Sequence, residues 1–67
     1  MPFLSSSAIR RAEYDSATMT LSIWFVDSGG PYDYYRVPED VYLALIQASS
    51  AGSFFNRYIR DQYSSNR

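Results

Sequence analysis

Residues 19–27, MTLSIWFVD, alternate between two kinds of position along the chain. Leu21, Ile23 and Phe25 fall on one side of an extended chain, because successive side chains of a strand point to opposite faces. The other side carries a mixed set, namely Thr20, Ser22, Trp24 and Val26. A period of two is typical of a half-buried strand. We therefore predict a strand over 19–27 whose first set of side chains faces the core.

Turn-forming residues flank this strand on both sides. Residues 15–18, DSAT, carry Asp and Ser side chains that hydrogen-bond their own following backbone. Residues 28–31, SGGP, form a second turn. Residues 8–14 and 32–37, beyond these turns, have the composition of strands, and the latter is rich in aromatic residues. Three strands joined by short turns predict an antiparallel meander.

A helical pattern follows Pro38, which suits the first position of a helix. Glu39 and Asp40 then place negative charge at the positive end of the helix dipole. The spacing predicts a helix over 39–48, whose apolar positions are Val41, Tyr42, Leu45, Ile46 and Ala48.

A second helix is predicted beyond an interruption at residues 49–52. Either Ser50 or Ser53 can cap its N-terminus, and the apolar pattern continues to about Tyr63. The predicted fold class is α+β, a three-stranded antiparallel β-meander followed by two short helices packed on one face. We expect one domain over residues 1–67, with loose ends at 1–7 and 64–67.

Composition limits the classes of function. The chain has 67 residues, of which 46% are hydrophobic and 18% aromatic, which is too many for a disordered tail. Its six basic residues are all arginine, and seven acidic residues bring the formal charge to −1. Proteins that bind nucleic acid non-specifically usually have a strong excess of positive charge, which this chain lacks. A local patch of arginines remains an alternative. With no long apolar run, we expect a soluble, cytoplasmic protein that does not enter a membrane.

Catalysis has little support in the sequence. His, Cys and Lys are absent, and these supply most general bases, nucleophiles and Schiff-base groups. Asp15, Asp27 and Asp33 lie at turns and strand ends, where carboxylates usually serve as turn formers. We therefore expect no catalytic residue, no cofactor and no metal site.

Aromatic residues of the third strand are candidate ligand contacts. Tyr32 and Tyr34 lie two apart and so share a face, where they either stack on bases or pack against the helices. Packing across strands is the commoner use of such residues, and we favour it. Tyr35 has the opposite facing, so Tyr35 and Trp24 become candidates for exposed contacts.

The arginines form three sets. Arg10 and Arg11 lie in the first strand, where alternation predicts that they face opposite sides of the sheet. Arg57 and Arg60 lie on successive turns of the second helix and can converge on one anion. Arg36 flanks the third strand. The alternative is that all of them are solvated charges or surface ion pairs with near-neutral energetics.

An ordered series of motifs resembles the KTSC family, a small domain named for the C-terminus of some lysyl-tRNA synthetases and also found alone in bacteria and phages. The motifs are Ser6-Ser7-x-Ile9, Tyr14-Asp15, Tyr32-x-Tyr34-x-x-Val37-Pro38 and Ala48-Ser49-x-x-Gly52-x-x-Phe55-Asn56-x-x-Ile59-Arg60. Glu13 departs from the pattern, which has Gly before the Tyr-Asp pair. RNA binding has been suggested for that family because of its association with the synthetases, and the resemblance implies the same for this chain. The implication rests on where the domain occurs and not on a mechanism.

The polar residues of these motifs have two interpretations. One gathers Ser6, Ser7, Ser49, Gly52, Asn56 and Arg60 into a pocket between the N-terminus and the helices, with Arg60 neutralising an anion. The other uses the Ser and Asn side chains as helix caps and Gly52 as the end of the first helix. The predicted ligand-binding residues are Ser6, Ser7, Arg10, Tyr32, Tyr34, Asn56, Arg57 and Arg60.

Two classes of function follow. The first is a non-catalytic module that binds RNA or a nucleotide-like anion through arginine and aromatic side chains. The second is a protein-interaction module, with a homodimer as its simplest form, that buries the open face of the sheet. The predicted interface residues of the second class are Trp24, Val26 and Tyr35.

Overall fold

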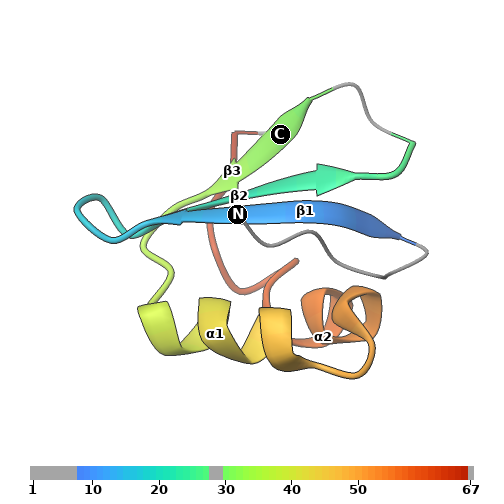
Figure 1. Ribbon diagram of the computed structural model, residues 1–67. Helices are drawn as coiled ribbons and strands as arrows, with labels where there is room; N and C mark the ends of the chain where they lie inside the picture. The colour runs from blue at the N-terminus through green and yellow to red at the C-terminus, as the bar shows by residue number, and fades with distance from the viewer. Residues whose placement is uncertain (1–7, 28–29, 67) are drawn as a thin grey trace.

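The computed structural model describes residues 8–27 and 30–66. Its elements follow in the order β1 (Ile9–Asp15), β2 (Thr20–Phe25), β3 (Pro31–Tyr34), α1 (Glu39–Gln47) and α2 (Ala51–Tyr58). The strands form an antiparallel sheet in the order β1-β2-β3. Both helices lie under one face of this sheet (Figure 1). The predicted α+β meander with two helices is confirmed.

The central strand places its alternating residues as predicted. Leu21 and Ile23 are fully buried, because β2 has a neighbour on each side and the helices beneath it. Ile23 lies opposite Ala12 of β1 and Tyr32 of β3. Phe25, at the end of β2, packs against the core but stays partly exposed.

The core joins the sheet to both helices through large side chains. Its buried members are Ile9, Ala12, Leu21, Ile23, Tyr34, Val37, Leu45, Ala51, Phe55 and Ile59. Tyr34 is only 1% exposed and meets Phe55 of α2 edge-to-face, with ring centroids 5.4 Å apart. The packing interpretation therefore holds for Tyr34.

The helix boundaries decide between the two predicted caps and correct two other predictions. Ser50 is the cap of α2, because its hydroxyl accepts a hydrogen bond from the Ser53 amide at 3.3 Å. Gly52 does not end α1, which stops at Gln47; it lies in the first turn of α2. The second helix ends at Tyr58 rather than at about Tyr63.

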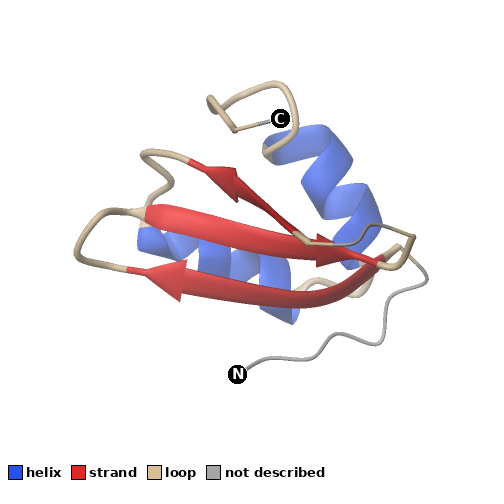
Figure 2. Cartoon of the chain, turned by 90° about the horizontal axis from the view of Figure 1, so that it is seen from above, coloured by secondary structure: helices blue, strands red, loops and turns tan. Residues whose placement is uncertain are grey.

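The end of α2 follows from the path of the chain beyond it. The amides of Ile59 and Arg60 both donate to the Phe55 carbonyl, at 3.0 and 2.9 Å, which closes the helix. Ile59 is buried, and the chain then turns toward the free edge of β3, as the view from above shows (Figure 2).

Residues 64–66 lie along β3, although a loose polar tail was expected over 64–67. The amide of Tyr35 donates to the Ser64 carbonyl at 2.9 Å, and the amide of Asn66 donates to the Asp33 carbonyl at 3.1 Å. The Asn66 side chain accepts from the Asp33 amide at 2.9 Å. A free strand edge offers unpaired backbone groups, and this segment satisfies them.

A bulge in β1 breaks the alternation predicted for Arg10 and Arg11. Ile9 pairs with Phe25 and Arg11 with Trp24, so Arg10 is the extra residue. Ile9 and Ala12 are both fully buried although they lie three apart. The two arginines between them therefore do not take opposite faces, and Arg10 is exposed.

No helix among the described residues has the length and apolarity needed to cross a membrane.

Shortening Ile23 tests the packing of the central strand. We expect Ile23→Val to lower the free energy of unfolding by about 0.5–1.5 kcal/mol and Ile23→Ala by about 2–5 kcal/mol. Urea denaturation followed by circular dichroism measures both. Val26→Ala is the control, because Val26 is 42% exposed and lies just beyond the end of the same strand. An Ile23→Ala protein as stable as the control would contradict the assigned core face.

Tyr14 gives the fold a pH dependence. Its hydroxyl donates to the Val37 carbonyl at 2.6 Å, and its ring stacks on Tyr42 at 5.1 Å. Desolvation, which has the largest effect, and the charges of Glu39, Asp40 and Asp15 raise the pKa of Tyr14 above the ordinary range of a tyrosine. The unfolded chain then loses this proton first, so stability is full below pH 10 and falls as the pH rises through the folded-state pKa.

Denaturation midpoints measured between pH 8 and 11 test this dependence. We expect the loss at alkaline pH to be smaller in Tyr14→Phe than in the wild type, because the titrating hydroxyl is removed. An identical alkaline loss in the two proteins would exclude Tyr14 as its source.

Candidate functional site

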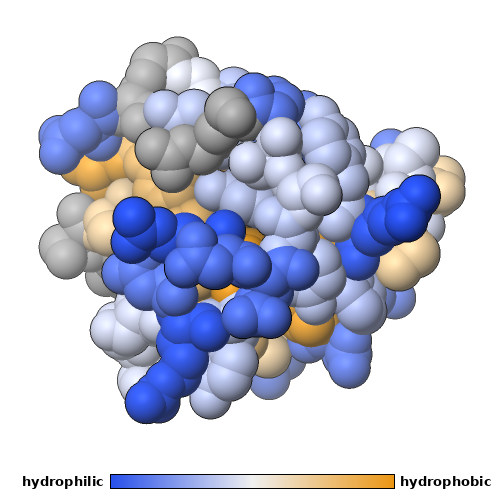
Figure 3. Space-filling model, turned by 180° about the vertical axis from the view of Figure 1, so that it is seen from behind, coloured by the Kyte–Doolittle hydropathy of each residue, from blue (hydrophilic) through white to orange (hydrophobic). Residues whose placement is uncertain are grey.

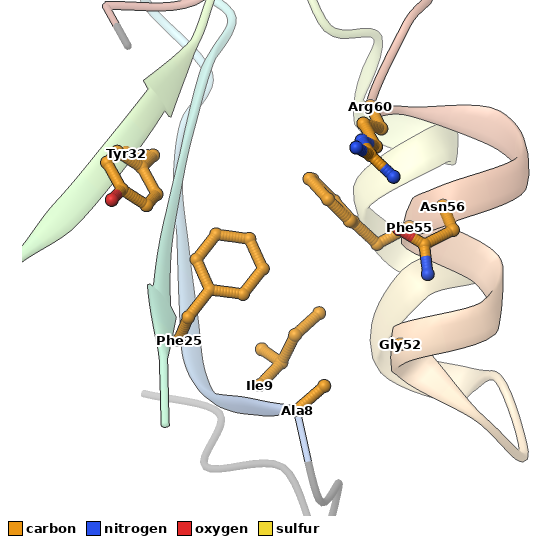
Figure 4. A pocket seen from close by; sticks show the side chains of 8 residues that line it. All are labelled: Ala8, Ile9, Phe25, Tyr32, Gly52, Phe55, Asn56 and Arg60. Atoms are coloured by element: carbon orange, nitrogen blue, oxygen red, sulfur yellow. The ribbon is translucent and has the colours of Figure 1, made fainter. Parts of the chain in front are cut away.

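A pocket of about 270 Å³ opens between the end of the sheet and α2. Figure 4 shows that β1 and β2 supply one wall and α2 the other, with Tyr32 of β3 at the side. The lining residues are Ala8, Ile9, Phe25, Tyr32, Gly52, Phe55, Asn56 and Arg60. The pocket exists at this end because α2 covers the start of β3 and the end of β2 incompletely.

Three aromatic rings form the apolar part of the pocket. The centre of the Phe25 ring lies 5.5 Å from that of Tyr32 in a tilted arrangement and 5.1 Å from that of Phe55 in an edge-to-face arrangement. Such pairs hold one another in position. Phe25 and Tyr32 are partly exposed, so the pocket offers aromatic surface to a flat apolar group.

Two polar side chains from the helix side complete the lining. Asn56 lies in α2 and Arg60 just beyond its end, four residues later, and both are exposed. The Asn56 amide can donate and accept hydrogen bonds, whereas the Arg60 guanidinium only donates. Within residues 8–27 and 30–66, Arg60 forms no ion pair with a carboxylate. The pocket thus combines aromatic surface with a cation available for an anion.

The structure brings together some of the predicted ligand residues. Tyr32, Asn56 and Arg60 line this pocket, and Gly52 joins them. Tyr34 does not, because its ring is buried under Phe55. Ser6 and Ser7 lie outside the described residues.

The remaining arginines of the predicted set lie elsewhere. Arg57 lines a separate hollow with Ser49, Ser50 and Ser53 near the start of α2. Convergence of Arg57 and Arg60 on a single anion would require both to line one pocket. They line different ones, so this prediction is wrong. Arg10 is exposed at the bulge of β1 and lines neither hollow.

Sequence reasoning assigned Phe25 to the core, and it named Phe55 only as part of a motif. The structure gives both a second role, because each packs on the core and also lines the pocket. The position of Phe25 at the end of its strand was the available signal, since the last inward side chain of a strand has the least cover.

The outer face of the sheet is more polar than the sequence indicated. The Arg11 guanidinium lies 4.7 Å from the centre of the Trp24 ring and is held by Glu13 at 2.8 Å. Ser22 donates a hydrogen bond to Asp33 at 2.6 Å on the neighbouring strand. Trp24, expected to lie on an uncovered face, is partly shielded by these contacts.

Charges of opposite sign are separated along the fold. Glu39 and Asp40 occupy the first turn of α1. Desolvation first, and then these two charges with that of Asp15, raise the pKa of Tyr14. Arg57 occupies the last turn of α2, and Arg60 follows it. The end of α2 therefore carries two arginines although the formal charge of the chain is −1, and Asp61 directly follows the second of them. Figure 3 shows hydrophilic residues gathered beside a hydrophobic area on the rear face of the molecule.

Comparison with known proteins bears on this pocket. The KTSC domain model matches residues 5–63, a range that includes every lining residue. The chain belongs to the KTSC family. The crystal structure of a KTSC domain protein from Yersinia pestis superposes with a TM-score of 0.90 at 33% sequence identity, covering 96% of this chain and 89% of that one.

Two relatives show settings in which sequences similar to this chain occur. A lysine–tRNA ligase from Nostoc punctiforme is 40% identical over 57 residues, which cover 85% of this chain and 10% of the ligase. The chain thus spans about a tenth of the ligases it matches. A protein from Tsukamurella paurometabola is 38% identical over 60 residues, covering 90% of this chain and 88% of that protein.

Removing the Arg11 side chain tests the shielding of Trp24. We expect Arg11→Ala to increase quenching of the Trp24 fluorescence by acrylamide, because the guanidinium no longer covers the ring. Arg10→Ala is a matched control, since it removes the same charge from the neighbouring position. Equal quenching in the wild type and in Arg11→Ala would contradict the cation–π contact.

Proposed function

We propose that this KTSC domain is a non-catalytic module that binds single-stranded RNA and holds one unpaired nucleotide in the pocket beside α2. The observation that carries the proposal is the meeting of three aromatic rings with Asn56 and Arg60 around one hollow. Each part of a nucleotide has a chemical counterpart there. The rings suit the base, the amide suits its polar edge and the guanidinium suits a phosphate.

Pocket size supports a single base as the occupant. Pockets for drug-sized ligands measure about 300–1,000 Å³, and this one is slightly smaller at about 270 Å³. Paired bases are not available for such insertion, whereas unpaired RNA bases can splay out and stack on aromatic side chains. The proposal therefore concerns loops, ends and single strands rather than duplexes.

The family relationship adds support of a different kind. The ligases from Nostoc punctiforme and Trichormus variabilis, 40% and 39% identical to this chain, act on a tRNA by name. A domain attached to such enzymes works beside an RNA that offers unpaired loops and ends. This support is contextual, and the pocket geometry supplies the physical argument.

Self-association through the outer face of the sheet is the alternative. Val26 and Tyr35 are 42% and 40% exposed and would contribute apolar contact. The alternative has weaker support, because Arg11 already covers part of Trp24. Sedimentation measured against protein concentration separates the two, since a homodimer must dissociate on dilution.

Arg60→Gln, compared with Arg57→Gln, tests the RNA proposal. Both variants remove one positive charge from an exposed arginine of the α2 region, but only Arg60 lines the pocket. We expect Arg60→Gln to weaken binding of a labelled single-stranded RNA about tenfold, equivalent to about 1.4 kcal/mol, and Arg57→Gln to change it little. Fluorescence anisotropy measures both. Equal weakening would indicate general charge attraction instead of the pocket.

Salt dependence provides a second measurement on the wild-type protein. One or two phosphate contacts predict a slope of about −0.7 to −1.4 in log affinity against log salt for a single strand. Between 50 and 200 mM salt, the affinity should therefore fall about three- to sevenfold. No saturable binding at either salt concentration would contradict the proposal.

A further inference from the structure

Besides the pocket beside α2 and the hollow at Arg57, a larger hollow of about 500 Å³ lies at the junction of β3 and the C-terminal segment. Its lining residues are Tyr35, Arg36, Gln62, Tyr63 and Ser64. Tyr35 is 40% exposed and Tyr63 is partly buried, so both present ring surface near a guanidinium and an amide. The side-chain chemistry repeats that of the first pocket, whose polar members are Asn56 and Arg60.

The backbone at this hollow has an unusual conformation. Arg36 has a φ of 59°, in the left-handed region that residues other than glycine rarely adopt. Hydrogen bonds on both sides impose it, because the Tyr35 amide donates to Ser64 and the Val37 amide donates to Met19, each at 2.9 Å. Arg36 is exposed and forms no ion pair with a carboxylate among the described residues. Strained residues of this kind concentrate at ligand sites.

One turn of the chain contributes to both hollows. Arg60 lines the first pocket, and Gln62 and Tyr63, two and three residues later, line the second. On the sheet side, Tyr32 of β3 belongs to the first hollow and Tyr35, just beyond β3, to the second. Their backbones are about 10 Å apart along an extended chain, and the odd spacing directs the two rings to opposite faces, so an RNA segment that reaches both passes round the end of β3. Figure 2 shows that β3, the C-terminal segment and the end of α2 are neighbours on one side of the molecule.

We propose that the hollow at Tyr35 and Arg36 is a second subsite for the same single-stranded RNA. A strand of a few nucleotides crosses the turn between the hollows and places one base in each. This inference rests on the proposed function and extends it from one bound nucleotide to a segment of RNA that occupies both hollows. Asp61 is exposed in the same turn and repels phosphate. Each hollow therefore needs both its rings, which stack on a base, and its guanidinium, which holds the RNA backbone away from Asp61.

The test is the dependence of binding on RNA length. Adenosine monophosphate and oligoadenylates of two, four and eight nucleotides are titrated into the isotope-labelled wild-type protein, and amide chemical shifts are followed. We expect the monophosphate to shift residues of the first pocket only. The octamer should bind at least tenfold more tightly than the dinucleotide and also shift residues 35, 36 and 62–64.

Arg36→Asn is the decisive variant, because asparagine tolerates the left-handed conformation while losing the charge. It should abolish most of the tenfold gain with length and leave monophosphate binding unchanged. Arg57→Gln is the matched control and should retain the gain. A gain with length that survives Arg36→Asn, or no gain at all, would overturn the second subsite.

These outcomes separate the two proposals. Monophosphate binding that weakens in Arg60→Gln, without any gain with length, keeps the first pocket as a nucleotide site and removes the second. Absence of binding at every length removes the proposed function, and the second subsite with it. Loss of monophosphate binding in Arg36→Asn would place the nucleotide in the wrong hollow and overturn both assignments.

Discussion

The edge-to-face contact between Tyr34 and Phe55 determines where α2 lies on the sheet. Tyr34 is the last residue of β3, and Phe55 is the central aromatic residue of a helix of only eight residues. Because this contact fixes α2 under one end of β3, Phe55 also reaches Phe25 at 5.1 Å and forms the wall of the first pocket. One packing interaction thus stabilises the fold and shapes the site.

The pocket lowers the stability of the domain, because it leaves aromatic side chains partly exposed in a chain of only 67 residues. Small domains bury a low fraction of their surface, and the sequence has no cysteine for a disulfide. Full coverage of Phe25 and Tyr32 would add apolar burial, yet both remain partly exposed. Pairing of residues 64–66 with β3 compensates in part, because it satisfies a free strand edge.

Much of the architecture was predictable from local patterns, and the exceptions share one cause. Alternation in β2 and the Pro38 boundary act locally, so the sequence shows them directly. The bulge at Arg10 and the left-handed Arg36 depend on backbone pairing between distant segments, and the path of residues 64–66 beyond α2 depends on pairing with β3. Such pairing leaves no periodic signal in the residues themselves, and propensity yields to tertiary context.

The candidate site was predictable in its polar residues and less so in its apolar ones. Asn56 and Arg60 stand out in the motif, whereas Phe25 and Phe55 are indistinguishable in sequence from core residues. Net charge was the weakest guide. Glu39 and Asp40 lie at the start of α1, so their charge is distant along the fold from the end of α2. Screening over about 8–10 Å at physiological salt limits their influence on an anion at Arg60. A domain with a formal charge of −1 can therefore present a local cation with aromatic surface, which is the combination that single-strand binding uses.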